Sequence, residues 1–338
     1  MDVHEISAHV LSADAWRLRG VGRARLRTML AERRLVIAHR GWYVDAKVWD
    51  AWYVEQRHAA QAIAVWRAQR GSQSVLSHTS AAVIHGLPLY RVTPTRVHVS
   101  DARANGRVGR EASVARHEVS VDGDVVCVDG LRVTSLARTV ADLIGAVPVE
   151  SAVSIADAAL RSVAWIGDDR AYDENEDDLF RADLRACSAL QPGARGSVQA
   201  RWVASFADGR AERPGESVSR VHLHRLGFAK PRVQVRIPRT RGYYDVDFAL
   251  DDVDVWGEFD GDGKYTDPAM RGDATALEVV IAEKRREDDI RGITRRSILR
   301  WGWPHIASPE ALRRRLAEFG AYAPGPPGVI PRAFASRV

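Results

Sequence analysis

Residues 243–265 read YYDVDFALDDVDVWGEFDGDGKY, and this stretch decides how the C-terminal part of the chain folds. Residues 243–250 and 253–259 each alternate apolar with polar or small side chains, which is the pattern of a half-buried β-strand. Between them stands the pair Asp251-Asp252, a sequence that favours a tight turn. The stretch therefore predicts a β-hairpin.

The turn fixes which residues of the hairpin face each other. If Leu250 lies opposite Val253, Asp245 lies opposite Glu258 and Asp247 lies opposite Trp256. Because side chains alternate between the two faces of a strand, one face is expected to carry all the acids. These acids are Asp245, Asp247, Glu258 and Asp260.

A face of like charges weakens a hairpin unless the charges are solvated or bind a cation. Carboxylate oxygens suit Mg²⁺, which uses one or two protein carboxylates and keeps positions for water and phosphate oxygens. The alternative is a solvated acidic hairpin with no ligand. Trp256, expected on the same face, argues weakly against full solvation.

Composition limits the classes of protein and partner. A chain of 338 residues predicts two or three domains, and a net charge of +5 with a pI near 9.4 favours polyanionic partners. The two cysteines, Cys127 and Cys187, indicate neither a disulfide framework nor a cysteine zinc site. No membrane-spanning run and no signal peptide stand out. We expect a cytoplasmic protein that binds nucleic acid, not a membrane or a small molecule.

The first 50 residues predict a winged helix. Residues 12–16 and 22–33 have helical spacing, and residues 35–39 and 42–44 have the pattern of two short strands. The arginines of this segment indicate a DNA-binding head, and the candidate DNA contacts are Arg19, Arg23, Arg25, Arg27, Arg34 and Arg40. The alternative is a basic pair of helices that contacts another protein.

The middle of the chain predicts a helix over residues 51–70 and then a second, capped helix within SHTSAAVIHGLPL at residues 77–89. His78 and His85 stand seven residues apart on this second helix. Without carboxylate or cysteine neighbours, two histidines are more often hydrogen-bonded core or cap residues than metal ligands.

SHTSAAVIHGLPL forms part of a resemblance to a known family. Together with RVHVS at 96–100, DGLRVTSLARTVADL at 129–143 and IADAALRS at 155–162, it resembles the AbiEi-type antitoxin and transcriptional-regulator family of type IV toxin–antitoxin systems. The resemblance covers roughly residues 2–162. It implies a winged helix that binds operator DNA, a central α/β domain with an antitoxin role, and a cognate toxin as a partner.

The remaining chain predicts a further domain. Residues 166–196 are acidic and turn-rich and indicate a linker with a short helix across 177–190. Residues 197–322 show the order helix, strand, strand, strand, helix, strand, helix of the restriction-endonuclease core, and they resemble the Vsr-like endonuclease-related domain. Residues 323–338 are a tail rich in proline and glycine. The expected fold is a mixed α/β multidomain chain: winged helix over 1–50, central α/β domain over 51–165, and C-terminal PD-(D/E)xK domain.

The nuclease resemblance implies roles for individual residues. Glu216 takes the place of the family's helix acid, Asp247 that of its strand aspartate and Glu258 that of its hairpin glutamate; Asp247 and Glu258 would hold Mg²⁺. Asp260 stands where the family usually has lysine, so Lys264 or Lys284 would have to supply the cation. A helix-start acid favoured by the helix dipole is the alternative for Glu216.

Two readings of the function follow. One is a DNA-binding regulator of the AbiEi type whose nuclease-like domain is catalytically silent, or which holds a toxin through its central domain. The other is a Mg²⁺-dependent endodeoxyribonuclease that a winged helix directs to foreign DNA, as in defence against phage. In the second, Mg²⁺ would lower the pKa of a bound water and offset charge on the phosphate.

Overall fold

The computed structural model describes residues 2–69, 74–101, 113–167, 170–189, 196–261 and 276–331. The chain is a mixed α/β protein with several sheets, and it separates into two compact units. The first unit contains residues 1–151 and 179–200, and the second contains residues 152–178 and 201–332. Across the described ranges, no helix has the length and apolar character needed to cross a membrane.

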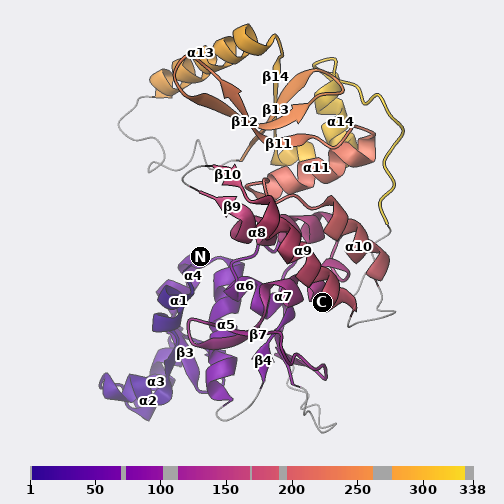
Figure 1. Cartoon of the computed structure of the whole chain (residues 1–338). Helices are drawn as coiled ribbons and strands as arrows, with labels where there is room; N and C mark the ends of the chain where they lie inside the picture. Colours follow the sequence, from indigo (N-terminus) through magenta and orange to yellow (C-terminus); the bar gives the residue numbers. More distant parts are fainter. Residues whose placement is uncertain are drawn as a thin grey trace. The chain divides into compact units, whose positions relative to one another are not determined.

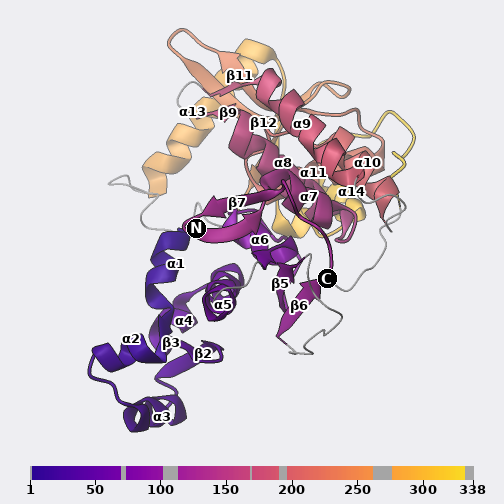
Figure 2. The same ribbon diagram turned by 60° about the horizontal axis from the view of Figure 1, so that its bottom comes forward.

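The N-terminal segment of the first unit is a small helical head with a three-stranded sheet (Figure 2). Its elements are α1 (Val3–His9), β1 (Leu11–Ser12), α2 (Ala13–Leu18), α3 (Arg23–Ala31), β2 (Leu35–His39) and β3 (Trp42–Asp45). The Ser12 hydroxyl caps α2 by accepting from the Ala15 N–H at 3.1 Å. Leu26 and Met29 of α3 pack against Leu35 of β2. The expected helices and strands of this segment are confirmed, while α1 was not expected.

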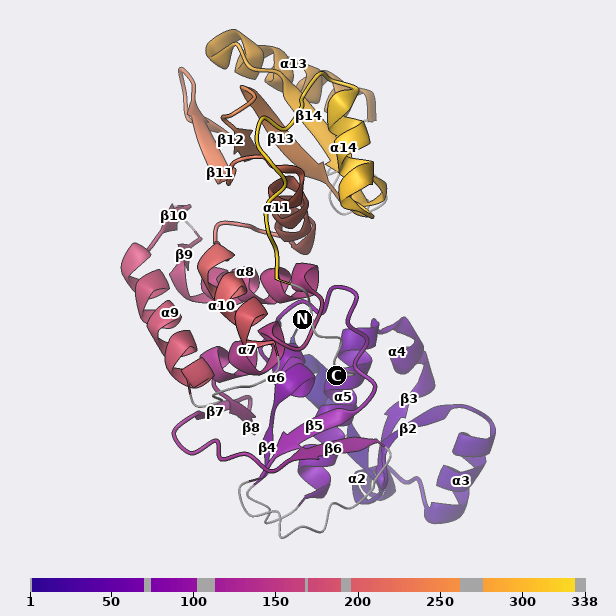
Figure 3. The ribbon, with the colours of Figure 1, turned by 90° about the vertical axis from the view of Figure 1, so that its right-hand side faces the viewer.

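The rest of the first unit is built on a five-stranded sheet in the order β6-β5-β4-β8-β7 (Figure 3). Its strands are β4 (Val75–Leu76), β5 (Val97–Ser100), β6 (Val114–His117), β7 (Val125–Val128) and β8 (Leu131–Thr134). Its helices are α4 (Ala46–Ala51), α5 (Val54–Ala68), α6 (His78–Ile84) and α7 (Leu136–Ile144). Along α5 the inward face is a run of small and branched residues such as Ala60 and Ile63, both fully buried.

Residues 166–196, expected to be an acidic linker, contain more structure than their composition indicates. The short β9 (Trp165–Ile166) and β10 (Ala171–Tyr172) pair antiparallel, and α9 (Glu174–Ala189) follows with 16 residues. Phe180 and Leu184 of α9 are buried. The acidic residues occupy the first turn of α9, where the helix dipole favours negative charge.

The second unit holds a four-stranded sheet in the order β11-β12-β13-β14, with β13 and β14 parallel and the other pairs antiparallel. Figure 1 shows α13 on one side of this sheet and α11 and α14 on the other. The strands are β11 (Arg232–Pro238), β12 (Tyr243–Leu250), β13 (Val255–Asp260) and β14 (Ile298–Gly302). The helices are α8 (Val149–Ala164), α10 (Ser197–Phe206), α11 (Pro214–Leu226), α13 (Ala276–Thr294) and α14 (Pro309–Ala317), and η2 (Trp303–Ile306) is a 3₁₀ turn.

The hairpin predicted from residues 243–265 is present, but its register differs by two residues. Leu250 lies opposite Val255, not Val253, and Phe248 lies opposite Gly257. The turn is longer than expected because Val253 donates its N–H back to the Leu250 carbonyl and Asp254 adopts a φ of +59°.

A buried ion pair ties α8 to α11 within the second unit. The Arg220 guanidinium lies 2.5 Å from the Asp157 carboxylate, and both side chains are almost fully buried. Arg220 also donates to the Phe206 carbonyl at 2.6 Å, and the Asp208 N–H donates to Asp157 at 2.8 Å. These extra hydrogen bonds offset part of the cost of removing the two charges from water, while Arg220 Nε has no hydrogen-bond partner among the described residues.

Candidate functional site

Two of the carboxylates predicted to be functional meet at one glutamine. The Gln234 side-chain amide of β11 donates to Glu216 at 3.1 Å and to Asp247 at 3.2 Å. Glu216 also accepts from the Glu212 N–H at 3.0 Å, and Asp247 accepts from the Phe259 N–H at 2.8 Å. The structure therefore brings Glu216 and Asp247 together across about 30 residues of sequence, with Gln234 as the link.

Burial of the Glu216 side chain changes its proton affinity. Burial, and after it the negative charge of Asp247, raise the pKa of Glu216 to about 8, although the hydrogen bonds from Glu212 and Gln234 oppose the shift. Glu216 is only 3% exposed. At neutral pH it is therefore mostly protonated, since two carboxylates at such a place do not both ionise readily.

Two backbone features allow the start of α11, which carries Glu216, to lie close to the sheet that carries Asp247. Gln234 has a φ of +50°, in the left-handed region that non-glycine residues adopt rarely and that occurs more often at functional sites. Gly215 precedes Glu216, and a Cβ there would lie 2.1 Å from the Phe259 ring. The absence of a side chain at Gly215 thus lets the start of α11 press against the end of β13.

Glu258 is neutralised by two arginines. One oxygen lies 2.6 Å from Arg286 of α13, and the other lies 3.1 Å from Arg300 of β14. Arg286 also donates to the Asp245 carbonyl at 2.5 Å. Arg300 lies 3.9 Å from Asp260, and it is shared with Glu283 and Glu287 of α13.

The acids do not form the single shared cluster that the alternating pattern predicted. Asp245 is paired with Arg170 at 3.1 Å and with Arg236 at 3.5 Å. Asp247 is linked to α11 through Gln234, whereas Glu258 is linked to α13. The expected carboxylate face is divided among separate partners because arginines from β11, α13, β14 and the β9–β10 turn reach into it.

These arrangements bear on the expected Mg²⁺ ligands. Both Glu258 oxygens contact guanidinium groups, and both Asp247 oxygens accept hydrogen bonds from nitrogen donors. A Mg²⁺ ion cannot share a site with positively charged groups, so Glu258 does not fit the ion while guanidinium groups contact both of its oxygens. Lys284 is exposed on α13, and Lys264 lies outside the described residues.

The candidate DNA-contacting arginines of the head are placed on its surface. Arg19, Arg23, Arg25, Arg27, Arg34 and Arg40 are all exposed. In the described part of the chain only Arg34 of these six has an ion-pair partner, Glu32 at 3.5 Å. Arg19 lies over the Trp16 ring at 5.9 Å. Gly22 is the N-cap of α3 and has an extended backbone. Arg23 and Arg25 therefore lie in the first turn of the helix.

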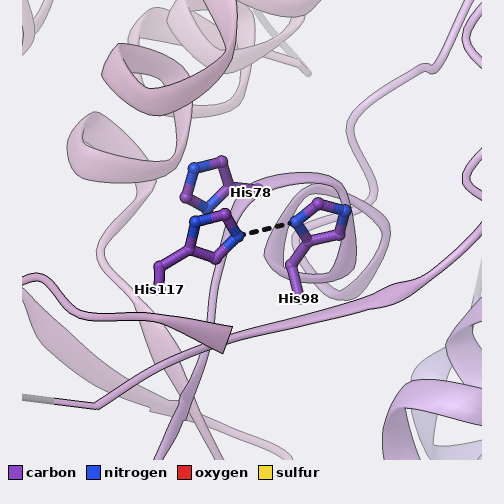
Figure 4. Close-up of side chains that lie close together, drawn as sticks. All are labelled: His78, His98 and His117. Carbon is purple, nitrogen blue, oxygen red and sulfur yellow. Dashed lines mark hydrogen bonds between the residues drawn. The ribbon is translucent and has the colours of Figure 1, made fainter. Parts of the chain in front are cut away.

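A cluster that the sequence did not indicate lies in the first unit, where three histidines meet (Figure 4). His98 Nδ1 and His117 Nε2 are 2.9 Å apart, and the ring of His78 stacks on that of His117 with 3.9 Å between centroids. Among the residues that the structure describes, these are the one group of three or more His, Cys, Asp or Glu side chains whose ligand atoms all lie within 4.8 Å of one another.

Burial keeps these histidines uncharged. It lowers the pKa of His78 to about 3 and that of His98 to about 3, and it also lowers the pKa of His117. The carboxylate of Asp142 opposes the shift at His117, and it lies 3.9 Å from His78. Arg138 holds Asp142 by a 2.8 Å hydrogen bond.

His78 and His85, which the sequence places seven residues apart, have different contacts in the structure. The ring of His85 bonds the Thr134 carbonyl at 2.8 Å, which confirms the expected hydrogen-bonded role. His78 instead joins His98 and His117, which stand 20 and 39 residues further along the chain. The cluster could have been predicted only if residues 114–117 had been recognised as a strand that pairs with residues 97–100. No strand was predicted for residues 114–117 from the sequence.

No protein-family model matches this chain. Two uncharacterized proteins of Mycobacterium tuberculosis, one from strain CDC 1551 / Oshkosh and one from strain H37Rv, are each 31% identical to it over 143 residues. The match covers 42% of this chain and 48% of each relative, so the chain spans about half the length of the curated relatives it matches.

Proposed function

We propose that this chain is a DNA-binding protein that contacts DNA through α3 and the β2–β3 hairpin. The head has the order helix, strand, helix, helix, strand, strand, and its sheet has the order β1-β3-β2. Winged-helix domains use this arrangement to present the last helix to the major groove and the hairpin to the backbone. The element order supports a winged helix here.

The observation that carries the proposal is the set of exposed arginines on the head. Arg23, Arg25 and Arg27 lie on α3 and are exposed to solvent. None of the three forms an ion pair with another of the described residues. Guanidinium groups displayed in this way neutralise phosphates and release counterions from DNA. Arg40 is also exposed, and it lies in the turn between β2 and β3 at the tip of the hairpin.

We further propose that the C-terminal domain does not cut DNA. The helix–strand order of residues 214–317 supports a restriction-endonuclease-like fold, with β11 to β14 between α11 and α13. The ionic contacts of Glu258 with Arg286 and Arg300 place cations where a metal would have to bind. Together with the resemblance to AbiEi-type regulators, this favours a regulator over a nuclease.

The DNA-binding proposal is tested with the duplex upstream of the chain's own gene. The double variant Arg23→Ala/Arg27→Ala should bind it roughly tenfold or more weakly than the wild type, because two cationic contacts are lost. The matched control is Arg313→Ala/Arg314→Ala, which removes the same charge from the exposed surface of α14. Unchanged affinity in the α3 variant, measured by gel shift, would refute the proposal.

The silent-domain proposal is tested with supercoiled plasmid and Mg²⁺. The wild type should bind the plasmid and leave it supercoiled over hours at a large excess of protein. Conversion to nicked circles that disappears in Asp247→Ala, but persists in Asp254→Ala, would show that the domain is an active nuclease. Asp254 suits as a control because it is an exposed acid in the β12–β13 turn that pairs with Arg296.

A further inference from the structure

Three adjacent strands bring the histidine cluster together. His78 is the first residue of α6 and follows β4, His98 lies in β5, and His117 ends β6. Strand β5 lies between β4 and β6 in the sheet. Since His98 pairs with Ala115, His117 projects from the same face two residues further along β6. We propose that His78, His98 and His117 form a binding site for one divalent transition-metal ion, with Zn²⁺ as the first candidate.

The nitrogen atoms are already near the spacing that a metal requires. His98 Nδ1 and His117 Nε2 are 2.9 Å apart, whereas two ligands at about 2.0–2.1 Å from a tetrahedral Zn²⁺ are about 3.3 Å apart. The pair therefore has to open by only a few tenths of an ångström. The proton that the two nitrogens share moves to the other nitrogen of its own ring, so both lone pairs face the ion and no proton is lost from the pair.

The surroundings of His78 favour the same arrangement. Its Nδ1 lies 3.1 Å from the Ser77 hydroxyl and 3.9 Å from the Asp142 carboxylate. These oxygen atoms can hold the Nδ1 proton, which leaves Nε2 as the ligand atom. A carboxylate behind a ligating histidine is a common feature of protein zinc sites, and here Arg138 fixes that carboxylate in turn.

The backbone at His78 is a second, independent observation. His78 has a φ of +50°, an unfavourable conformation for a residue with a side chain, and it has this conformation at the first position of α6. Such outliers persist where the surrounding structure needs a side chain in one particular place. In this case His78 lies beside His98 and His117 with all three ligand atoms within 4.8 Å of one another, and its ring, now stacked on that of His117, has to turn about its side-chain torsions for Nε2 to point at the shared ion.

The residue types define the class of ion. Three imidazoles suit Zn²⁺, Co²⁺, Ni²⁺ and Cu²⁺ and do not suit Mg²⁺ or Ca²⁺, which prefer oxygen. Three protein ligands leave a fourth position for water or an anion. The His78 side chain is 18% exposed, so solvent reaches the cluster from that side. This site is separate from the carboxylates of the second unit and does not depend on the proposed DNA contacts.

The test uses the full chain after treatment with a chelator, titrated with Co²⁺ and followed by visible absorption. One equivalent of Co²⁺ should produce the intense bands of a four-coordinate site, and Zn²⁺ should abolish them. His117→Gln should bind Co²⁺ at least about 100-fold more weakly, because losing a side chain that binds the metal directly has a larger effect than the 10–100-fold typical of losing a residue that only supports such a side chain. The control His4→Gln, at an exposed position of α1, should bind as the wild type does.

If His117→Gln does not fold, the melting temperature of the wild type in the presence of Zn²⁺ provides a second test of the metal site. Zn²⁺ should raise the melting temperature of the wild type in proportion to the logarithm of its concentration above the dissociation constant, and Mg²⁺ should not. A wild-type chain with neither cobalt bands nor a zinc-dependent shift would overturn the metal site. DNA binding is measured separately, so this result would leave the DNA proposal untouched.

Discussion

Glu216 shows how one buried side chain can make stability depend on pH. Its carboxyl group lies at the start of α11, is almost completely buried, and shares the Gln234 amide with Asp247. Its pKa rises from an ordinary 4.5 to about 8. A group that holds its proton more tightly in the folded chain than in the unfolded chain lowers stability as pH rises between these two values. Below 4.5 both states are protonated and the effect vanishes.

We therefore expect Glu216→Gln to stabilise the protein in alkaline solution and to have little effect near pH 5. At about pH 9 the gain should be a few kcal/mol at most, since each unit of pKa shift corresponds to about 1.4 kcal/mol. Urea unfolding followed by tryptophan fluorescence at both pH values measures it. The control is Glu318→Gln, an exposed acid after α14. A Glu216→Gln gain that is equal at the two pH values would contradict this account.

At the residue scale, the sequence located the acids but not their partners. Period-two alternation correctly placed Asp247 and Glu258 on adjacent strands. It gave no sign that Arg286 of α13 would pair with Glu258. Long side chains choose partners across elements through tertiary packing, which a single sequence does not display.

At the element scale, the C-terminal sheet depends on glycine where two aromatic rings approach. Gly257 of β13 faces Trp301 of β14 and Phe248 of β12, whose rings stack with 5.3 Å between centroids. A Cβ at Gly257 would lie 2.3 Å from the Trp301 ring. The Trp301 indole cannot retreat freely, since it is 1% exposed and donates to Ser219 of α11 at 2.8 Å.

Gly257→Ala should consequently destabilise the chain by about 1–3 kcal/mol through overpacking. Gly292→Ala provides a comparison of opposite sign. Gly292 lies within α13 with open space around its Cβ position, so alanine there should stabilise by about 0.5–1 kcal/mol. Thermal unfolding of the two variants checks both signs. Equal effects would mean that the packing around Trp301 is not as tight as described.

The ends of helices and strands are predictable where a periodic apolar pattern is followed by a residue that terminates the element, such as glycine. Gly227, in the left-handed conformation with a φ of +96°, ends α11, and glycine is the residue that most often takes this position after a helix. The order of three strands, a helix and a fourth strand that was expected within residues 197–322 is also present. The β12–β13 turn was placed two residues short because Val253 looks like a strand residue, and α9 was underestimated because its acidic composition hides a buried apolar stripe.

At the scale of the whole molecule, the chain divides into two compact units, whereas the sequence indicated three domains and a linker. The head and the five-stranded sheet belong to one unit, and α8 carries the chain into the other. Compositional shifts mark acidic or turn-rich segments, but they do not reveal which helices pack together. The net charge of +5 and the exposed arginines of the head are the features of the whole chain on which the proposal of a DNA partner rests.

The most direct test of this account is the salt dependence of DNA affinity, measured by fluorescence anisotropy with the full chain. The logarithm of the wild-type binding constant should fall linearly with the logarithm of salt concentration. The slope for Arg23→Ala/Arg27→Ala should be shallower by about 2, which is roughly one per lost phosphate contact, while Arg313→Ala/Arg314→Ala keeps the wild-type slope. A wild-type chain that does not bind DNA, or an α3 variant with the wild-type slope and affinity, would contradict the central claim.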